Sequence, residues 1–179
     1  MPEIFDTYFG PQVHSIYSGV EATMKKETLP LCALALSVYT EVLGGLVTGN
    51  LKEKHSPREN YVAFLSYLGQ PYVDLHNEID LYTTIRSKFV HEFSPRPSYI
   101  ILLSDTVQNR LGIEYVPDKA ETRIEDGKSV MMLSKGCLNF WVREYYRDFK
   151  NGIEQYRDQL KDEKDPLFMN FIKSLAIHD

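Results

Sequence analysis

Two residues in the segment 81–97, LYTTIRSKFVHEFSPRP, have side chains suited to chemistry. Arg86 carries a positive charge that it does not lose at any physiological pH, so it attracts anions. His91, five residues further on, has an imidazole that exchanges protons near neutral pH and is therefore suited to acid–base chemistry. The two residues are equally compatible with structural roles, as an ion-paired core arginine and a histidine at the end of a helix.

The place of Arg86 in its helix makes its charge costly. Helical spacing predicts a helix from Asp74 to about Phe93. Its hydrophobic stripe consists of Leu75, Ile79, Tyr82, Phe89 and Phe93. Arg86 takes the missing place in this stripe, where burial costs several kcal/mol unless an anion is close. Glu41 is the only acid in the apolar helix predicted for residues 30–48, so we predict an ion pair between Glu41 and Arg86.

His91 points away from the hydrophobic stripe. Five residues correspond to about 140° around an ideal helix, so the side chains of Arg86 and His91 diverge. His91 lies in the last turn before Pro95 and Pro97, where the helix dipole favours its protonated form. Within one helix the two side chains therefore do not share a small pocket unless Arg86 reaches around the flank of the helix. They flank a common cleft if a second copy packs nearby, as in a two-fold dimer.

The surrounding elements are predicted to be mainly helical. Residues 3–27 have helical spacing with a break at Gly10-Pro11, and Pro57 begins a further helix. A long helical stripe runs from about Ser134 to Leu160, and a short helix starts near Asp165-Pro166. Gly49 is expected to end the apolar helix as its C-cap.

The middle of the chain has β-prone segments. They lie at residues 99–103, 112–116, 122–125 and 129–133. The turn sequence EDGK favours a hairpin that pairs residues 121–125 with 128–133. We therefore predict a mainly α-helical bundle with a small antiparallel β insertion at about residues 99–133, within a single domain that covers residues 1–179.

Composition narrows the functional classes. A net charge of −5 gives no broad basic field for nucleic acid. The two cysteines and the scattered histidines show no metal-ligand spacing, and no glycine-rich phosphate loop is present, so we expect neither a metal nor a cofactor. The helix at 30–48 is interrupted by Pro30, Glu41 and the pair Gly44-Gly45, which favours a buried core helix over a membrane span. We expect a cytoplasmic protein without a membrane association.

The spacing from Arg86 to His91 resembles the R-x-x-x-x-H motif of the HEPN superfamily of helical domains. The context is similar as well, because an apolar helix with an acid precedes the segment LYTTIRSKFVHEF. The resemblance covers roughly residues 30–97, with the helix after Ser134 as a fourth bundle member. It does not extend to residues 99–133.

This resemblance implies a metal-independent endoribonuclease of toxin or defence type that acts as a homodimer, with RNA as its substrate. His91 is then the general acid or base at the ribose 2′-hydroxyl, and Arg86 holds the scissile phosphate. Glu41 and Ser87 have supporting roles, with Ser87 in a place where many active members have Asn or another polar residue. A cognate antitoxin or a nucleotidyltransferase is the kind of partner that the superfamily suggests.

The same resemblance also allows a second interpretation from a different functional class. Many HEPN-like domains are non-catalytic modules for dimerisation or partner binding. In that case Arg86 is a structural ion-pair arginine and His91 is a surface histidine at a helix terminus. The two interpretations differ in whether Arg86 and His91 meet in an open cleft or whether Arg86 is closed against Glu41.

Overall fold

A computed structural model gives the structure of the protein. It describes residues 2–26, 28–51, 57–87, 90, 100–103, 110–117, 119–125, 128–134 and 136–175. His91 and, apart from Val90, the other residues at positions 88–99 lie outside these residues.

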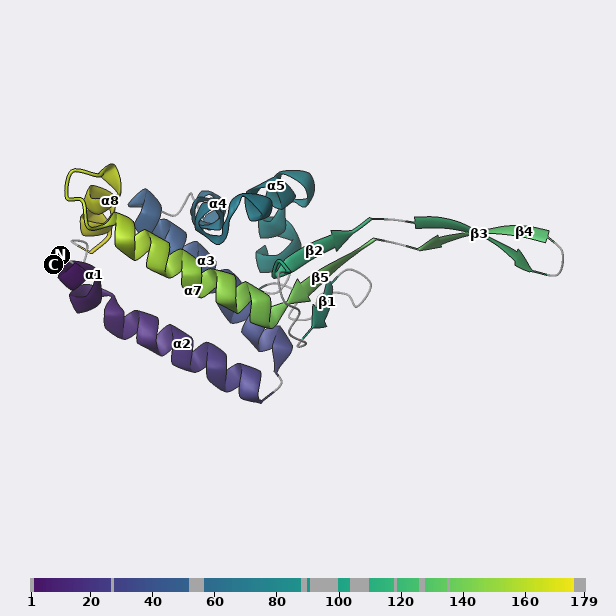
Figure 1. Ribbon diagram of the computed structural model, residues 1–179, viewed down its shortest axis with the longest axis horizontal. Helices are drawn as coiled ribbons and strands as arrows, with labels where there is room; N and C mark the ends of the chain where they lie inside the picture. The colour runs from purple at the N-terminus through teal and green to yellow at the C-terminus, as the bar shows by residue number, and fades with distance from the viewer. Residues whose placement is uncertain are drawn as a thin grey trace.

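The described helices form a body from which a long β-ribbon extends (Figure 1). The helices are α1 (Pro2–Tyr8), α2 (Gly10–Lys25), α3 (Leu29–Thr48), α4 (Pro57–Leu68), α5 (Gln70–Ile79), the π-helix η1 (Tyr82–Ser87), α7 (Val142–Gln159) and α8 (Pro166–Leu175). The strands are β1 (Ile100–Leu103), β2 (Ile113–Val116), β3 (Lys119–Glu125), β4 (Lys128–Ser134) and β5 (Cys137–Trp141). The predicted class, mainly helical with a small antiparallel β part, is confirmed.

Several predicted helix ends are also confirmed. The first helical region is split at Phe9, directly before Gly10 and Pro11. Gly49 caps α3 in the left-handed conformation with φ of 73°, as the sequence predicts for a C-cap glycine. Pro57 begins α4, and the Asp165 carboxylate accepts a hydrogen bond from the Leu167 backbone N–H at 2.9 Å at the start of α8.

The helix predicted from Asp74 to Phe93 is wrong in its start and in its continuity. α5 begins four residues earlier, at Gln70, because Pro71 fits the first helical turn. It ends at Ile79, and Asp80 adopts a left-handed conformation with φ of 48°. Thr83 donates its backbone N–H and its hydroxyl to the Asp80 carboxylate, which stabilises this break. The chain then continues as the wider π-helix η1.

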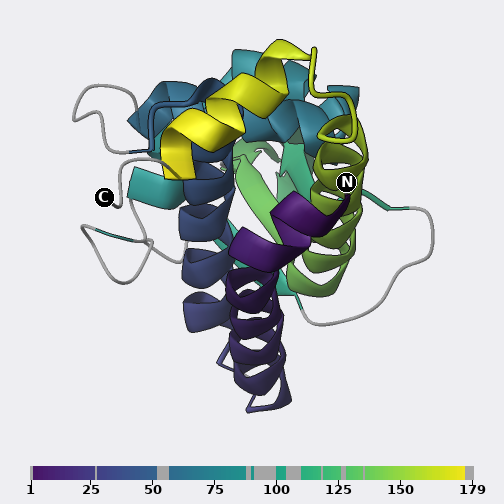
Figure 2. The same cartoon turned by 90° about the vertical axis from the view of Figure 1, so that its left-hand side faces the viewer.

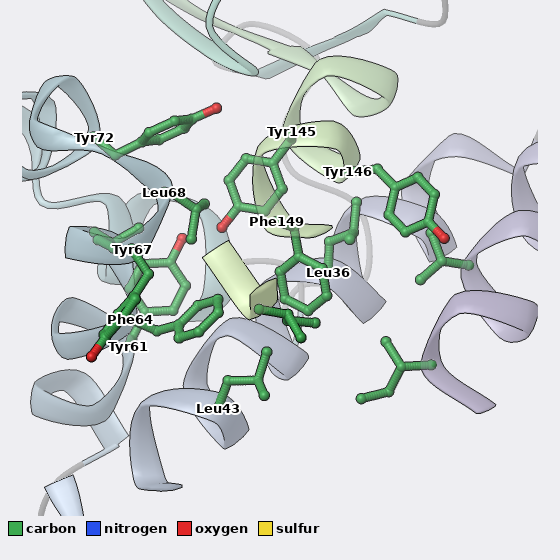
Figure 3. Close-up of a cluster of buried hydrophobic side chains, with 14 of the residues drawn as sticks. Leu36, Leu43, Tyr61, Phe64, Tyr67, Leu68, Tyr72, Tyr145, Tyr146 and Phe149 are labelled. Carbon is green, nitrogen blue, oxygen red and sulfur yellow. The ribbon is translucent and has the colours of Figure 1, made fainter. Parts of the chain in front are cut away.

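Helix α3 lies at the centre of the helical body. It contacts α2, α4, α7 and α8, and Figure 2 shows it running beside α7 in the end-on view. The core around it is rich in aromatic side chains, several of which Figure 3 displays between α3, α4 and α7. Its fully buried aromatic members are Tyr61, Phe64, Tyr72, Phe140, Tyr145, Phe149, Tyr156 and Phe171. The length and composition of α3 would suffice for a membrane span, and half of its apolar window is buried inside the protein. A single helix of this kind is weak evidence for a membrane span, because core helices of soluble proteins have the same properties.

The approach of α3 to α4 depends on glycine. A Cβ atom at Gly44 would lie 1.6 Å from the backbone oxygen of Asn60 in α4. At Gly45 a Cβ atom would lie 2.9 Å from a methyl carbon of Leu51. Gly44 therefore allows the backbones of α3 and α4 to approach closely, and Gly45 leaves room for Leu51, which follows α3.

The strands form two paired regions. β5 lies between β1 and β2, parallel to β1 and antiparallel to β2. β3 and β4 form an antiparallel hairpin whose register runs from Lys119 opposite Ser134 to Glu125 opposite Lys128. The predicted pairing of residues 121–125 with 128–133 is confirmed.

The two antiparallel regions share one register. Ile113 is opposite Phe140 and Val116 is opposite Cys137, and three residues further along Lys119 is opposite Ser134. The pairing therefore keeps the same register from β2 and β5 into β3 and β4. We call the ribbon made of these four strands the arm. Figure 1 shows β3 and β4 at the end of the arm, far from the helices.

The β region is larger than predicted. Residues 137–141 were expected to belong to a helix beginning near Ser134, but they form β5, and α7 begins only at Val142. Burial along β5 follows a strand, because Leu138 and Phe140 are buried while Cys137 and Asn139 are half-buried. The hydrophobic spacing of α7 continues back only to Trp141, the last residue of β5. The parallel pairing of β1 with β5 was also not predicted.

Candidate functional site

Glu41 lies on the side of α3 that faces η1. The neighbouring residues Thr40 and Gly44 face α7 and α4, so Glu41 is directed to the remaining flank of the helix. Its side chain is 18% exposed, and α3 carries no other acid. A carboxylate in this half-buried position is stable only beside a positive charge or hydrogen-bond donors.

Arg86 provides both. Its Nη2 donates to Glu41 Oε1 at 3.2 Å, and its Nε lies 2.5 Å from Glu41 Oε2. The Nε–Oε2 contact lacks hydrogen-bond alignment, so it contributes charge attraction while the Nη2–Oε1 pair contributes the hydrogen bond. The Arg86 side chain is 19% exposed, similar to that of Glu41. The predicted ion pair between Glu41 and Arg86 is therefore confirmed.

An aromatic ring holds Arg86 from a second side. The guanidinium carbon lies 5.6 Å from the centre of the Tyr82 ring, within the range of a cation–π contact. Tyr82 in turn packs edge-to-face against Tyr61 of α4, with ring centres 5.7 Å apart. Arg86 is thus oriented by contacts with α3 and, through Tyr82, with α4.

The position of Arg86 differs from the predicted one at the centre of a hydrophobic stripe. Leu81 and Ile85 are the fully buried residues here, and Tyr82 and Arg86 lie beside them at partial exposure. The difference arises at Asp80, because its left-handed conformation ends the periodicity that begins in α5. The wider turn of η1 then shifts the following residues around the axis.

The predicted site residues are only partly brought together. Glu41 and Arg86 meet, and Ser87 is the half-buried last residue of η1. His91 lies outside the described residues, so its distance from Arg86 stays a prediction. Among the described residues no group of three or more His, Cys, Asp or Glu side chains is arranged to hold a metal ion.

Sequence reasoning missed a second polar group at the end of α5. His76 is 6% exposed, its Nδ1 has no hydrogen-bond partner among the described residues, and burial lowers its pKa. One turn later Asp80 forms an ion pair with Arg58 of α4 at 3.3 Å. Burial alone raises the pKa of Asp80, but the hydrogen bonds from Thr83 and the charge of Arg58 hold it below its usual value. The sequence contains one signal for this polar group, the four-residue spacing from His76 to Asp80.

Another polar group fixes the base of the arm to the helices. The Tyr72 hydroxyl donates to Asp148 of α7 at 2.5 Å and accepts the backbone N–H of Gly112 at 2.8 Å. Burial raises the pKa of Tyr72 far above its usual value, so this hydroxyl stays protonated. Arg147 completes the arrangement by binding Asp148 and donating to the backbone oxygen of Arg110 at 2.8 Å. The start of β2 is therefore attached to both α5 and α7.

Chemically, the Glu41–Arg86 pair is a neutral unit. A free arginine binds phosphate through its fork of N–H donors, but here one Nη2 donor and the Nε side face Glu41. Comparison of the chain with protein-family models, with curated proteins and with solved structures gave no match.

Proposed function

We propose that the protein is a non-enzymatic interaction module. In this proposal the Glu41–Arg86 pair is a structural joint between α3 and η1, and the projecting arm makes contacts outside the helical body. The observation that carries the proposal is the occupation of the Arg86 guanidinium by both carboxylate oxygens of Glu41. Binding of a substrate phosphate by Arg86 would have to displace a partner that is already in place.

Charge supports the same function. The chain carries 20 basic and 25 acidic residues, so its net charge repels a polyanion unless basic residues gather locally. The Glu41 carboxylate adds a negative charge at the position where an RNA phosphate would have to bind. Binding to another protein does not require this repulsion between the chain and a polyanion to be overcome.

A second candidate is a metal-independent ribonuclease of the HEPN type, in which Arg86 and His91 of a homodimer act on RNA. One observation favours it: the Arg86 side chain keeps about a fifth of its surface exposed, at the end of a π-helix, a feature common at functional sites. A cognate antitoxin or a nucleotidyltransferase would be the partner of such a protein. A cytoplasmic location is proposed for either function.

An RNA-cleavage assay combined with a growth-arrest assay separates the two candidates. Wild type and His91→Ala are compared in the presence of a chelator, with His14→Ala, an exposed histidine of α2, as the matched control. For an interaction module we expect the three proteins to behave alike. Cleavage of RNA by wild type and by His14→Ala, together with its loss in His91→Ala, would refute the proposal.

A further inference from the structure

We propose that the outer edge of β3 is a self-association surface, on which the β3 strands of two copies of the chain pair antiparallel about a two-fold axis at Thr122. This proposal rests on the proposed function, because it names the partner and the surface of the interaction module. It is argued from the register of the arm and from the order of charges along β3.

Among the described strands, none pairs with the outer edge of β3. Within the part of the chain that the structure describes, β3 pairs with β4 on one side only. Figure 1 shows both strands at the end of the arm, well away from the helical body. A strand at a sheet edge presents a row of backbone N–H and C=O groups that can pair with another chain. A two-stranded ribbon alone is also only marginally stable in water, and a third or fourth strand stabilises it.

The charges along β3 are self-complementary when the strand meets a reversed copy of itself. The sequence KAETRIE has charged residues at every second position, with signs that alternate as plus, minus, plus, minus. With the axis at Thr122, Lys119 lies opposite Glu125 of the second copy and Glu121 lies opposite Arg123 of the second copy. By symmetry each pairing occurs twice, so four cross-strand pairs of opposite charge form.

The same charges exclude the neighbouring registers. A shift by two residues in one direction places Glu121 opposite Glu125 and brings the two copies of Arg123 together. A shift in the other direction places Lys119 opposite Arg123 and brings the two copies of Glu121 together. Like charges directly opposite each other are destabilising, so only the Thr122 register combines full overlap with attraction. A slip of one residue would place charged positions opposite uncharged ones.

Residues on the other face of β3 agree with this register. Ala120, Thr122 and Ile124 alternate with the four charged residues along β3, so strand periodicity predicts that they share the opposite face. In the proposed pairing Ala120 lies opposite Ile124 of the second copy, and Thr122 lies opposite itself. The uncharged face of each ribbon therefore continues across the axis into the uncharged face of the second ribbon.

The pattern points to a second copy rather than to a different protein. An isologous two-fold contact requires one surface to complement itself, and alternating charges around a central Thr122 meet that requirement. Charged residues on the edge of a sheet can also serve to prevent pairing with another chain. A run of charges of one sign would be enough for that purpose, whereas the charges of β3 alternate in sign. The overlap spans only the seven residues of β3, so the association belongs to the weak class of interfaces and depends on concentration.

Charge reversal tests the register directly. Arg123→Glu and Glu121→Arg each convert two attractive pairs into repulsive ones, and we expect either variant to weaken self-association about tenfold or more in sedimentation velocity. In the register of the hairpin Arg123 pairs with Val130 and Glu121 pairs with Met132, so neither substitution changes a directly opposed pair of charged residues within the hairpin. The double variant Glu121→Arg/Arg123→Glu restores opposite charges and is expected to associate like wild type.

A mixture of the two single variants is the matched control. A chain with Glu at both positions and a chain with Arg at both positions complement each other, so the mixture is expected to form a heterodimer although neither variant associates alone. Circular dichroism of each variant checks that the helical body is folded. Wild type that stays monomeric up to millimolar concentration, or single variants that associate as wild type does, would overturn the proposal.

Cross-linking checks the position of the axis. Thr122 lies opposite itself, and paired strands hold opposed Cα atoms at about 4.5–5.5 Å, within reach of a disulfide. In a Cys137→Ser background, Thr122→Cys is expected to form a disulfide-linked dimer on mild oxidation, whereas Ala120→Cys alone is expected to form none. A dimer band of equal strength from both would place the contact elsewhere. These outcomes concern only the arm, so they are independent of the RNA-cleavage assay that tests the proposed function.

Discussion

Arg86 of η1 contacts both carboxylate oxygens of Glu41 in α3, across a separation of 45 residues in the chain. Each of these residues would carry a half-buried charge without the other, and together they form a neutral joint between two elements of the helical body. The pair therefore explains why an arginine lies beside the hydrophobic core without requiring a catalytic role.

A double-mutant cycle on this pair measures how strongly the two charges are coupled. Glu41→Ala and Arg86→Ala each leave one charge without its partner, and each is expected to lower the free energy of unfolding by about 1–3 kcal/mol. The double variant is expected to lose less than the sum, by about 1 kcal/mol, in urea denaturation. The exposed pair Asp158–Lys161 at the C-terminal end of α7 is the control, with a smaller expected coupling. Additive losses at Glu41 and Arg86 would contradict the coupling.

The sequence predicts this pair because each of the two residues would otherwise bury an unpaired charge. Glu41 was the only acid in an apolar helix and Arg86 was the only charge in a hydrophobic stripe, so burial made their contact the simplest solution. The hairpin of β3 and β4 was predictable for a different, local reason, since its turn residues and strand lengths determine its register.

Other features depend on contacts that no local pattern encodes. The break at Asp80 is stabilised by Thr83 and Arg58, and it changes the periodicity on which the 74–93 helix was predicted. β5 is a strand because β1 and β2 pair on both of its sides, although Trp141 continues the helical spacing of α7. Tertiary pairing here outweighs the local preference.

Glycine at position 44 is predicted to be indispensable for the packing of α3 on α4. In Gly44→Ala the new methyl group would lie 1.6 Å from a backbone oxygen of α4, so the helices must move apart. We expect a loss of about 3 kcal/mol or more in the free energy of unfolding. The control is Gly19→Ala in α2, where a Cβ atom meets nothing within 4 Å and the helix gains about 0.5–1 kcal/mol. Equal thermal stability of the two variants would contradict this packing.

Removal of the Tyr72 hydroxyl is predicted to loosen the base of the arm. Tyr72→Phe removes the acceptor of the buried Gly112 N–H and one of the donors to Asp148, at a cost of about 1–3 kcal/mol. Hydrogen exchange is expected to increase at the backbone amides of β2 in this variant. Tyr156→Phe is the control, because the Tyr156 hydroxyl has no hydrogen-bond partner among the described residues. Unchanged exchange in Tyr72→Phe would show that the arm is held by other contacts.

Acidification is predicted to destabilise the protein through His76. Burial lowers the pKa of His76 in the folded state, with the charge of Arg58 acting in the same direction and that of Asp80 opposing it. In the unfolded chain the imidazole recovers its ordinary pKa of 6.5. As the pH falls through this value, the unfolded state takes up a proton that the folded state does not yet bind, so the free energy of unfolding decreases. The decrease stops once the pH is below the pKa of the folded state.

The variant His76→Gln isolates this contribution, because glutamine does not titrate. Urea denaturation at pH 7.5, 6.5 and 5.5 is expected to show a smaller loss of stability on acidification for His76→Gln than for wild type. His14→Gln, at an exposed position of α2, controls for the general effect of removing a histidine and is expected to follow wild type. The comparison uses the slope with pH within each variant, so a variant of lower overall stability remains informative. Parallel slopes for all three proteins would mean that His76 titrates alike in the folded and unfolded states, against the effect expected from its burial.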